Sequence, residues 1–102
     1  MKLKQIEIDM NNPIFQKNLF SLGKNELTVL IKILYKISQM TWPMLYADKG
    51  LKWESISSKR TNNNERIYSF RFSQKYRATA LRDGNFLRIL TLHTDHDSAY
   101  EK

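Results

Sequence analysis

The 102-residue sequence contains no cysteine, only three glycines and two prolines, and no long uninterrupted run of apolar residues. Without cysteine, the chain can form neither a disulfide framework nor a thiolate metal site. Low glycine and proline content argues against a fibrous or disordered protein. A membrane-spanning helix needs roughly 18 apolar residues. We therefore predict no membrane anchor and no export signal, and expect a cytoplasmic protein.

The length and apolar content of the chain predict one compact domain. Hydrophobic residues make up 41% of the sequence, which is enough for a single core. A second core would need roughly another hundred residues. We therefore expect residues 1–102 to form a single domain.

The formal net charge of +7 is distributed unevenly. Every arginine lies in the second half of the chain: Arg60, Arg66, Arg71, Arg77, Arg82 and Arg88. Arginine forms bidentate contacts with phosphate and stacks on bases. The composition therefore favours a polyanionic ligand, either a nucleic acid or an acidic protein segment, bound by the second half.

The first half of the sequence predicts a strand followed by two helices. Residues 3–10 alternate in polarity as a strand does. Asparagines before Pro13 predict a helix start, with a short helix over 13–22 whose inward side chains would be Ile14, Phe15, Leu19 and Phe20. A longer helix over 25–40 carries a core-facing stripe of Leu27, Leu30, Ile31, Leu34 and Ile37. Trp42 and Pro43 are expected to end it.

The second half predicts an antiparallel meander. Residues 50–56 suit a short strand or an extended arm, and 57–65 an exposed polar loop. Strands are predicted over 67–72, 76–82 and 85–93, with a two-residue turn at Asp83-Gly84. The predicted fold class is therefore α+β: an N-terminal strand, two helices, then about three antiparallel strands, forming one sheet covered by the helices.

Reactive side chains are densest after the last predicted strand, where His93, Asp95, His96 and Asp97 follow one another. Their spacing matches no established metal motif, so no metal is predicted. The three glycines are too far apart for a phosphate-binding loop, and no serine lies in a nucleophile elbow. We predict no small-molecule cofactor.

RNA cleavage by the neighbouring 2′-hydroxyl makes better use of these residues. It needs a base, an acid and cations around the phosphate. His93 or His96 could transfer the proton, Arg71 and Arg77 could hold the phosphate, and Tyr100 could stack on a base or donate its hydroxyl. A purely structural interpretation stays open, in which Tyr100 anchors the tail and the arginines pair with the nearby aspartates.

The segments GLKWESIS and IYSFRFSQKYRATALRDGNFLRILTLHTDHDSAY resemble the RelE/ParE toxin superfamily, particularly members that end in a His-Asp-x-Ala-Tyr motif. The most specific pieces are Tyr76-Arg77 and the stretch from His96 to Tyr100, together with their spacing around the Asp83-Gly84 turn. The resemblance spans almost the whole chain. Several cleft lysines of RelE members are replaced here by Tyr68, Ser69 and Phe70.

The resemblance implies a type II toxin neutralised by a cognate antitoxin with an acidic or amphipathic segment. In the RelE branch it implies ribosome-dependent cleavage of mRNA. Arg77 would then hold the scissile phosphate, Arg71 would add charge, and His96 with Tyr100 would lie near the reacting nucleotide. Further RNA contacts are expected from Lys59, Arg60, Lys75, Arg82 and His93. Two alternatives stay open: a non-catalytic ParE-like toxin that binds DNA gyrase, and a basic RNA- or ribosome-binding domain without nuclease activity.

Overall fold

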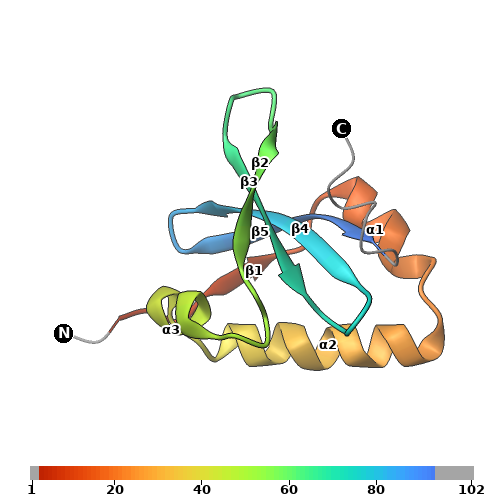
Figure 1. The fold of residues 1–102 in the computed structure, drawn as a ribbon. Helices are drawn as coiled ribbons and strands as arrows, with labels where there is room; N and C mark the ends of the chain where they lie inside the picture. The colour runs from red at the N-terminus through yellow and green to blue at the C-terminus, as the bar shows by residue number, and fades with distance from the viewer. Residues whose placement is uncertain (1–2, 94–102) are drawn as a thin grey trace.

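A computed structural model describes residues 3–93 and shows a five-stranded sheet at the centre of the molecule (Figure 1). The strand order is β1-β5-β4-β3-β2, with the bounds β1 (Glu7–Asp9), β2 (Glu54–Arg60), β3 (Arg66–Arg71), β4 (Arg77–Asp83) and β5 (Phe86–His93). β1 pairs parallel to β5, and the other pairs are antiparallel. The predicted α+β class is confirmed, and the N-terminal strand joins the sheet beside the last strand.

Three helices follow β1 along the chain: α1 (Pro13–Phe20), α2 (Lys24–Ser38) and α3 (Trp42–Ala47). α1 begins where predicted, because the Asn12 side chain accepts hydrogen bonds from the backbone N–H groups of Ile14 and Phe15. In Figure 1, α2 runs along one side of the sheet, and α3 lies near the C-terminal end of α2.

The third helix was not predicted, and the expected role of Trp42-Pro43 was wrong. α2 ends at Ser38, and the dipeptide begins α3 instead. Thr41 caps this helix, since its hydroxyl accepts a hydrogen bond from Met44 N at 3.5 Å. Proline lacks a backbone N–H, so it suits a first helical turn as well as it ends a preceding helix.

The hydrophobic core lies between the sheet and the helices. Its fully buried members come from α1, α2, α3 and the strands and include Phe15, Leu30, Ile37, Leu45, Phe70, Ala78, Leu87 and Ile89. Leu27 and Ile31, both expected in the core stripe, are 36% and 53% exposed. Successive helix residues are rotated by about 100°, so Ile31 turns away from the line of Leu30, Leu34 and Ile37. Ile14 and Phe20 of α1 are also exposed, so the inward sets predicted for both helices were too wide.

The β4–β5 hairpin turns one residue later than predicted. Asp83 is the last residue of β4 and pairs with Phe86, which leaves Gly84 and Asn85 as the two-residue loop. Gly84 has a φ of +60°, and Asn85 does not adopt positive φ. Glycine at the first loop position with positive φ fits a type II′ turn, which matches the twist of the flanking strands.

The β2–β3 hairpin extends beyond the rest of the sheet (Figure 1). Residues 57–60 were predicted as loop but belong to β2. β4 pairs only with the part of β3 from Tyr68 to Arg71, so the turn end of the hairpin has no third strand beside it. The turn is closed by Thr61, whose N–H donates to Glu65 O at 3.1 Å and whose hydroxyl accepts from Glu65 N at 3.0 Å.

Within residues 3–93, no helix is long and apolar enough to cross a membrane.

Candidate functional site

The two sides of the sheet differ in chemistry because successive strand residues point to opposite sides. On β3 and β4, Phe70 and Ala78 face the helices and belong to the core. Their neighbours Ser69, Arg71 and Arg77 therefore face the other side. That side also carries Thr79, which lies between Ala78 and Ala80 on β4.

Strand register arranges these polar side chains in two rows across the sheet, because directly paired residues share a face. In the first row Glu54 pairs with Ser69, Ser69 with Thr79, and Thr79 with Thr91. In the second row Arg71 pairs with Arg77, and Arg77 with His93. We call this set the polar sheet face: Glu54, Ser69, Arg71, Arg77, Thr79, Thr91 and His93.

Arg77 lies at the centre of the polar sheet face and is 1% exposed. Its Nη2 donates hydrogen bonds to Ser69 Oγ at 2.9 Å, to Lys52 O at 3.3 Å and to Glu54 Oε1 at 3.3 Å. A buried charge is tolerated when it is paired and hydrogen-bonded in this way. The Glu54 side chain is 42% exposed, so Arg77 fixes a carboxylate that solvent can still reach.

A second hydrogen-bonded chain connects β4 to the end of β5. The hydroxyls of Thr79 and Thr91 are hydrogen-bonded to each other, and Thr91 Oγ1 lies 2.8 Å from His93 Nε2. The imidazole is thereby held beside its own strand. Glu54 and His93 stand on strands three spacings apart, about 14 Å between backbones at ~4.8 Å per spacing.

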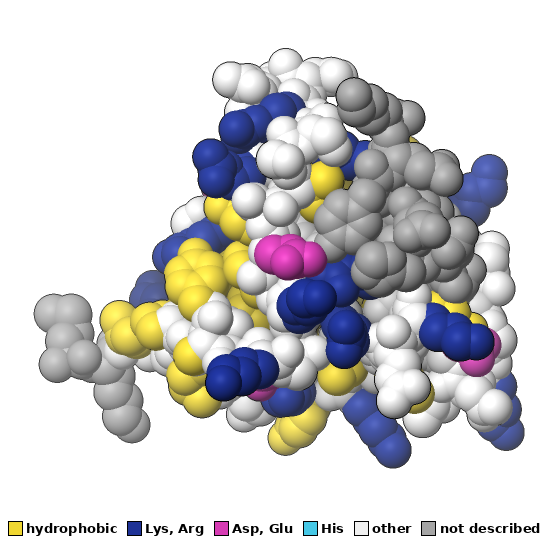
Figure 2. Space-filling model, viewed as in Figure 1, with side chains coloured by type: hydrophobic (Ala, Val, Ile, Leu, Met, Phe, Trp, Pro, Cys, Tyr) yellow, Lys and Arg dark blue, Asp and Glu magenta, His cyan; other side chains and the backbone are white. Residues whose placement is uncertain are grey.

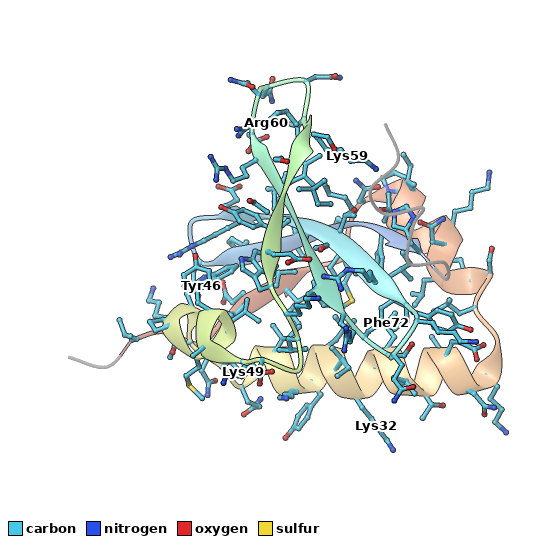
Figure 3. All side chains as sticks on the ribbon, in the orientation of Figure 1. Lys32, Tyr46, Lys49, Lys59, Arg60 and Phe72 are labelled. Carbon is cyan, nitrogen blue, oxygen red and sulfur yellow. The ribbon has the colours of Figure 1, made fainter. Side chains whose placement is uncertain are left out.

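Other residues predicted from the sequence lie elsewhere. Lys59 and Arg60 are in the outer part of the β2–β3 hairpin (Figure 3). Lys75 is exposed in the turn between β3 and β4. His96 and Tyr100 lie outside the described residues. Within residues 3–93, the polar sheet face therefore brings together Arg71, Arg77 and His93 of the predicted set: Arg71, Arg77, His93, Lys59, Arg60, Lys75, Arg82, His96 and Tyr100.

Arg82 is on the helix side of the sheet. Its guanidinium carbon lies 4.4 Å from the centroid of the Trp42 ring, and its Nη1 donates to Tyr46 Oη at 2.6 Å. Its Nε also donates to Gly84 O at 3.1 Å. Arg82 is thus separated from Arg77 by the thickness of the sheet, and any RNA contact that it makes would belong to a different surface.

Sequence reasoning did not identify Glu54, Ser69, Thr79 or Thr91 as site residues. The alternation of the strands does place Arg77 and Thr79 on one face. Alternation does not predict which strands pair. Only that pairing brings Glu54 of β2 into contact with Arg77 of β4.

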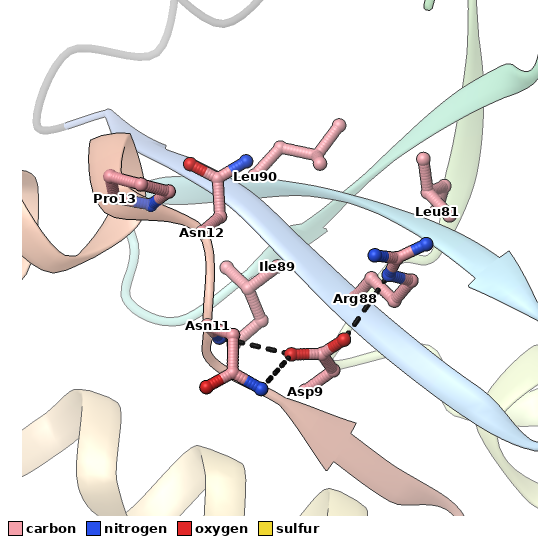
Figure 4. A pocket seen from close by; sticks show the side chains of 8 residues that line it. All are labelled: Asp9, Asn11, Asn12, Pro13, Leu81, Arg88, Ile89 and Leu90. Carbon is pink, nitrogen blue, oxygen red and sulfur yellow. Dashed lines mark hydrogen bonds and ion pairs between the residues drawn. The ribbon is translucent and has the colours of Figure 1, made fainter. Parts of the chain in front are cut away.

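A hollow of about 340 Å³ lies between the end of β1 and β5 (Figure 4). Arg88, on its wall, pairs with Asp9 Oδ2 at 3.1 Å and with Asp83 Oδ2 at 3.4 Å. Asp9 Oδ1 also accepts hydrogen bonds from Asn11 N and Asn11 Nδ2, both at 2.9 Å. These contacts, that with the Asn11 backbone N–H foremost, lower the pKa of Asp9. Since Asp9 and Asp83 balance Arg88, this hollow is a weak candidate for an anion.

The visible surface in Figure 2 shows many lysine and arginine side chains and few acidic ones, in keeping with the net charge of +7. In the described part of the chain, no group of three histidine, cysteine or acidic side chains is placed to hold a metal ion. The chemistry available on the polar sheet face is thus that of a carboxylate, two arginines, hydroxyls and an imidazole.

Comparison with solved structures finds two similar chains. One is from the archaeal RelE–RelB complex of Pyrococcus horikoshii, with 14% sequence identity, a TM-score of 0.64, and coverage of 90% of this chain and 96% of that chain. The other is from the YoeB dimer of Staphylococcus aureus, with 17% identity, a TM-score of 0.51, and coverage of 85% and 93%. No protein-family model and no curated protein matches the sequence. The chain therefore has a RelE-like fold.

Proposed function

We propose that this chain is the toxin of a type II toxin–antitoxin pair and that it cleaves RNA on the polar sheet face. Its fold resembles that of a chain in the RelE–RelB complex, and its charge of +7 suits an RNA ligand. The observation that carries the proposal is the half-exposed Glu54 carboxylate, fixed 3.3 Å from the buried Arg77.

The proposed reaction is attack of a ribose 2′-hydroxyl on the adjacent phosphorus. A new bond forms between the 2′-oxygen and phosphorus, and the bond from phosphorus to the 5′-oxygen breaks. The products are a 2′,3′-cyclic phosphate and a free 5′-hydroxyl. A base must accept the 2′ proton, an acid must donate a proton to the 5′-oxygen, and cations must stabilise the charge on the phosphate.

Glu54 is the base in this proposal, because its carboxylate is accessible and its orientation is fixed. Arg71 is the cation that meets the phosphate: it is partly exposed and, within residues 3–93, forms no ion pair. Arg77 acts as a positioning residue, since its guanidinium is buried and bonded to Glu54 and Ser69. This changes the role expected from the sequence, in which Arg77 itself holds the phosphate. His96 and Tyr100 remain the predicted candidates for the acid.

We further propose that the substrate is mRNA on the ribosome and that a cognate antitoxin with an acidic segment neutralises the chain. A basic protein of this size is attracted both to a ribosome and to an acidic partner. Copurification with the product of a neighbouring small reading frame would test the antitoxin.

Induced expression followed by mapping of mRNA 5′ ends tests the activity. Cuts phased with codons, together with 2′,3′-cyclic phosphate ends, are expected. Glu54→Gln should reduce cleavage by at least about 100-fold, the usual contribution of a general base. Arg77→Lys should reduce it as well, because the shorter lysine side chain does not place its nitrogen where Nη2 contacts Ser69 and Glu54.

Glu7→Gln is the matched control, because it removes the same charge from an exposed position on β1. It should leave cleavage unchanged. Growth arrest with intact mRNA and trapped DNA–gyrase complexes would refute the nuclease in favour of the gyrase-binding alternative. Full cleavage by Glu54→Gln would refute the assignment of the base.

A further inference from the structure

Two arginines face each other near the end of the β2–β3 hairpin. Arg60 on β2 pairs directly with Arg66 on β3, after an irregularity in the register that begins at Ser55. Both side chains are exposed. Like charges directly opposite each other on paired strands are destabilising. The hairpin therefore carries a local excess of positive charge that opposes its own folding.

A small hollow of about 90 Å³ lies against this pair. Its lining consists of the two arginines, two serines and one buried apolar residue: Ser55, Ile56, Ser57, Arg60 and Arg66. No acidic residue contributes to it. Hydroxyl and guanidinium groups are all hydrogen-bond donors, and a phosphate oxygen accepts from both.

No carboxylate neutralises these arginines among residues 3–93, where neither Arg60 nor Arg66 forms an ion pair. The nearest acid along the chain is Glu65, and its Oε1 accepts a hydrogen bond from the Thr61 hydroxyl at 3.2 Å. The other arginine pair consists of Arg71 on β3 and Arg77 on β4. There, by contrast, Arg77 forms an ion pair with Glu54. The chain thus compensates one pair internally and leaves the other to solvent or to a ligand.

We propose that Arg60 and Arg66 form a phosphate clamp, with the hydroxyls of Ser55 and Ser57 as additional donors, and that it holds the backbone of an RNA strand. The RNA identity of the ligand rests on the proposed function. The clamp is a second contact, separate from the Arg77–Glu54 pair, and adds Arg66 and the two serines to the residues expected to bind RNA.

RNA is favoured over an acidic peptide for two reasons. These residues line a single hollow small enough for one phosphate group, whereas a peptide would spread its carboxylates along the strand. Arg71 also carries positive charge on β3, five residues from Arg66, or about 17 Å in an extended strand, and the odd separation places the two side chains on opposite faces. An RNA backbone bound at Arg71 would reach the clamp by passing round the edge of the hairpin, whose turn end has no third strand beside it (Figure 1).

The test is the salt dependence of binding to a 2′-O-methyl oligoribonucleotide, which cannot be cleaved, measured by fluorescence anisotropy with the full chain. Each phosphate contact with a single strand contributes about 0.7 to the slope of log affinity against log salt. Because the clamp holds one phosphate group, Arg60→Gln combined with Arg66→Gln should lower the slope by about 0.7. The melting temperature should not fall, because the substitution removes a repulsion.

Lys24→Gln combined with Lys32→Gln is the matched control. Both lysines are exposed on α2, and the two substitutions remove the same charge as those of the arginines. Figure 3 shows Lys32 at the opposite end of the molecule from Arg60. This control should leave the slope nearly unchanged. Arg60→Lys combined with Arg66→Lys should keep the slope but weaken binding, because the bidentate geometry is lost.

An equal fall of the slope in the lysine control would overturn the clamp, since net charge alone would then explain the effect. An unchanged slope in the arginine variant would overturn it too, as would an equal loss of binding to an oligoglutamate peptide. These outcomes are independent of cleavage. If the wild-type protein shows the clamp but cuts no RNA, the nuclease proposal fails and the clamp stands.

Discussion

The two faces of β3 and β4 are buried to a similar degree but are stabilised by different forces. On the helix side, Phe70 and Ala78 are 0% exposed and pack against other apolar groups. On the polar side, Ser69 and Arg77 are 0% and 1% exposed and depend on hydrogen bonds and an ion pair. A low exposed fraction therefore does not by itself identify a hydrophobic core. A buried side chain is stabilised either by apolar packing or by hydrogen bonds and ion pairs, and a substitution removes whichever of these is present.

The largest expected effect comes from the helix side. Phe70→Ala removes a fully buried ring that lies 6.3 Å, centroid to centroid, from Trp53, and should lower the free energy of unfolding by about 3–5 kcal/mol. Urea denaturation measures this. Phe86→Ala, at a position 46% exposed, is the matched control and should cost much less. Equal losses would mean that the described packing around Phe70 does not exist in solution.

An intermediate effect is expected from the polar side. Arg77→Met leaves Ser69 and Glu54 without this donor and should lower the free energy of unfolding by about 1.5–3 kcal/mol. The loss is smaller than for breaking a fully buried ion pair, because the Glu54 side chain is 42% exposed. RNA cleavage should be lost as well. Combining it with Glu54→Gln removes the carboxylate charge and should recover part of the stability in urea denaturation. A double variant less stable than the two single losses added together would contradict this account.

The smallest expected effect concerns Asp48, at the end of α3. Its carboxylate accepts a hydrogen bond from Leu51 N at 2.9 Å and pairs with Lys36 at 3.0 Å. These contacts, that with the Leu51 N–H foremost, hold the pKa of Asp48 below its ordinary value of 3.8. Asp48→Asn keeps an oxygen for Leu51 but loses the ion pair, so about 0.2–1 kcal/mol should be lost at neutral pH.

The pH dependence of that loss has a defined sign. Because the folded pKa of Asp48 lies below the unfolded one, the unfolded chain binds the proton first. The stabilisation is complete above the ordinary value of 3.8 and disappears as the pH falls through the lowered value. The difference in unfolding free energy between wild type and Asp48→Asn should shrink over that acidic range. A difference that grows on acidification would show that the carboxylate is not stabilised by its contacts.

Much of the fold could be predicted from local patterns. Alternation located β3, β4 and β5 to within one residue, but the strand predicted over 3–10 is longer than β1. The Asn12 cap and Pro13 located α1, and the glycine at 84 located the last hairpin to within one residue. α3 was missed because Trp42-Pro43 is compatible with both a helix end and a helix start. The extent of β2 was missed because its outer half is polar, and a strand paired on one side with solvent around it needs no apolar pattern.

The candidate site was only partly predictable, because its geometry depends on pairing between distant segments. Arginine content drew attention to Arg71 and Arg77, and alternation placed Thr79 beside them. Glu54 becomes a site residue only because β2 pairs with β3, and the sequence of neither strand predicts that pairing. The predicted roles of His96 and Tyr100 remain predictions, since both lie outside residues 3–93.

The parallel pairing of β1 with β5 has a consequence for the order of folding. Asp9 and Arg88, 79 positions apart in the chain, are joined by a salt bridge in that pair. Contacts between such distant segments form late, because the loop between them must be closed first. During synthesis, β1 has no partner until β5 has left the ribosome. The row that contains Arg77 also lacks His93 until then, so the complete surface would appear only after β5 has been synthesised.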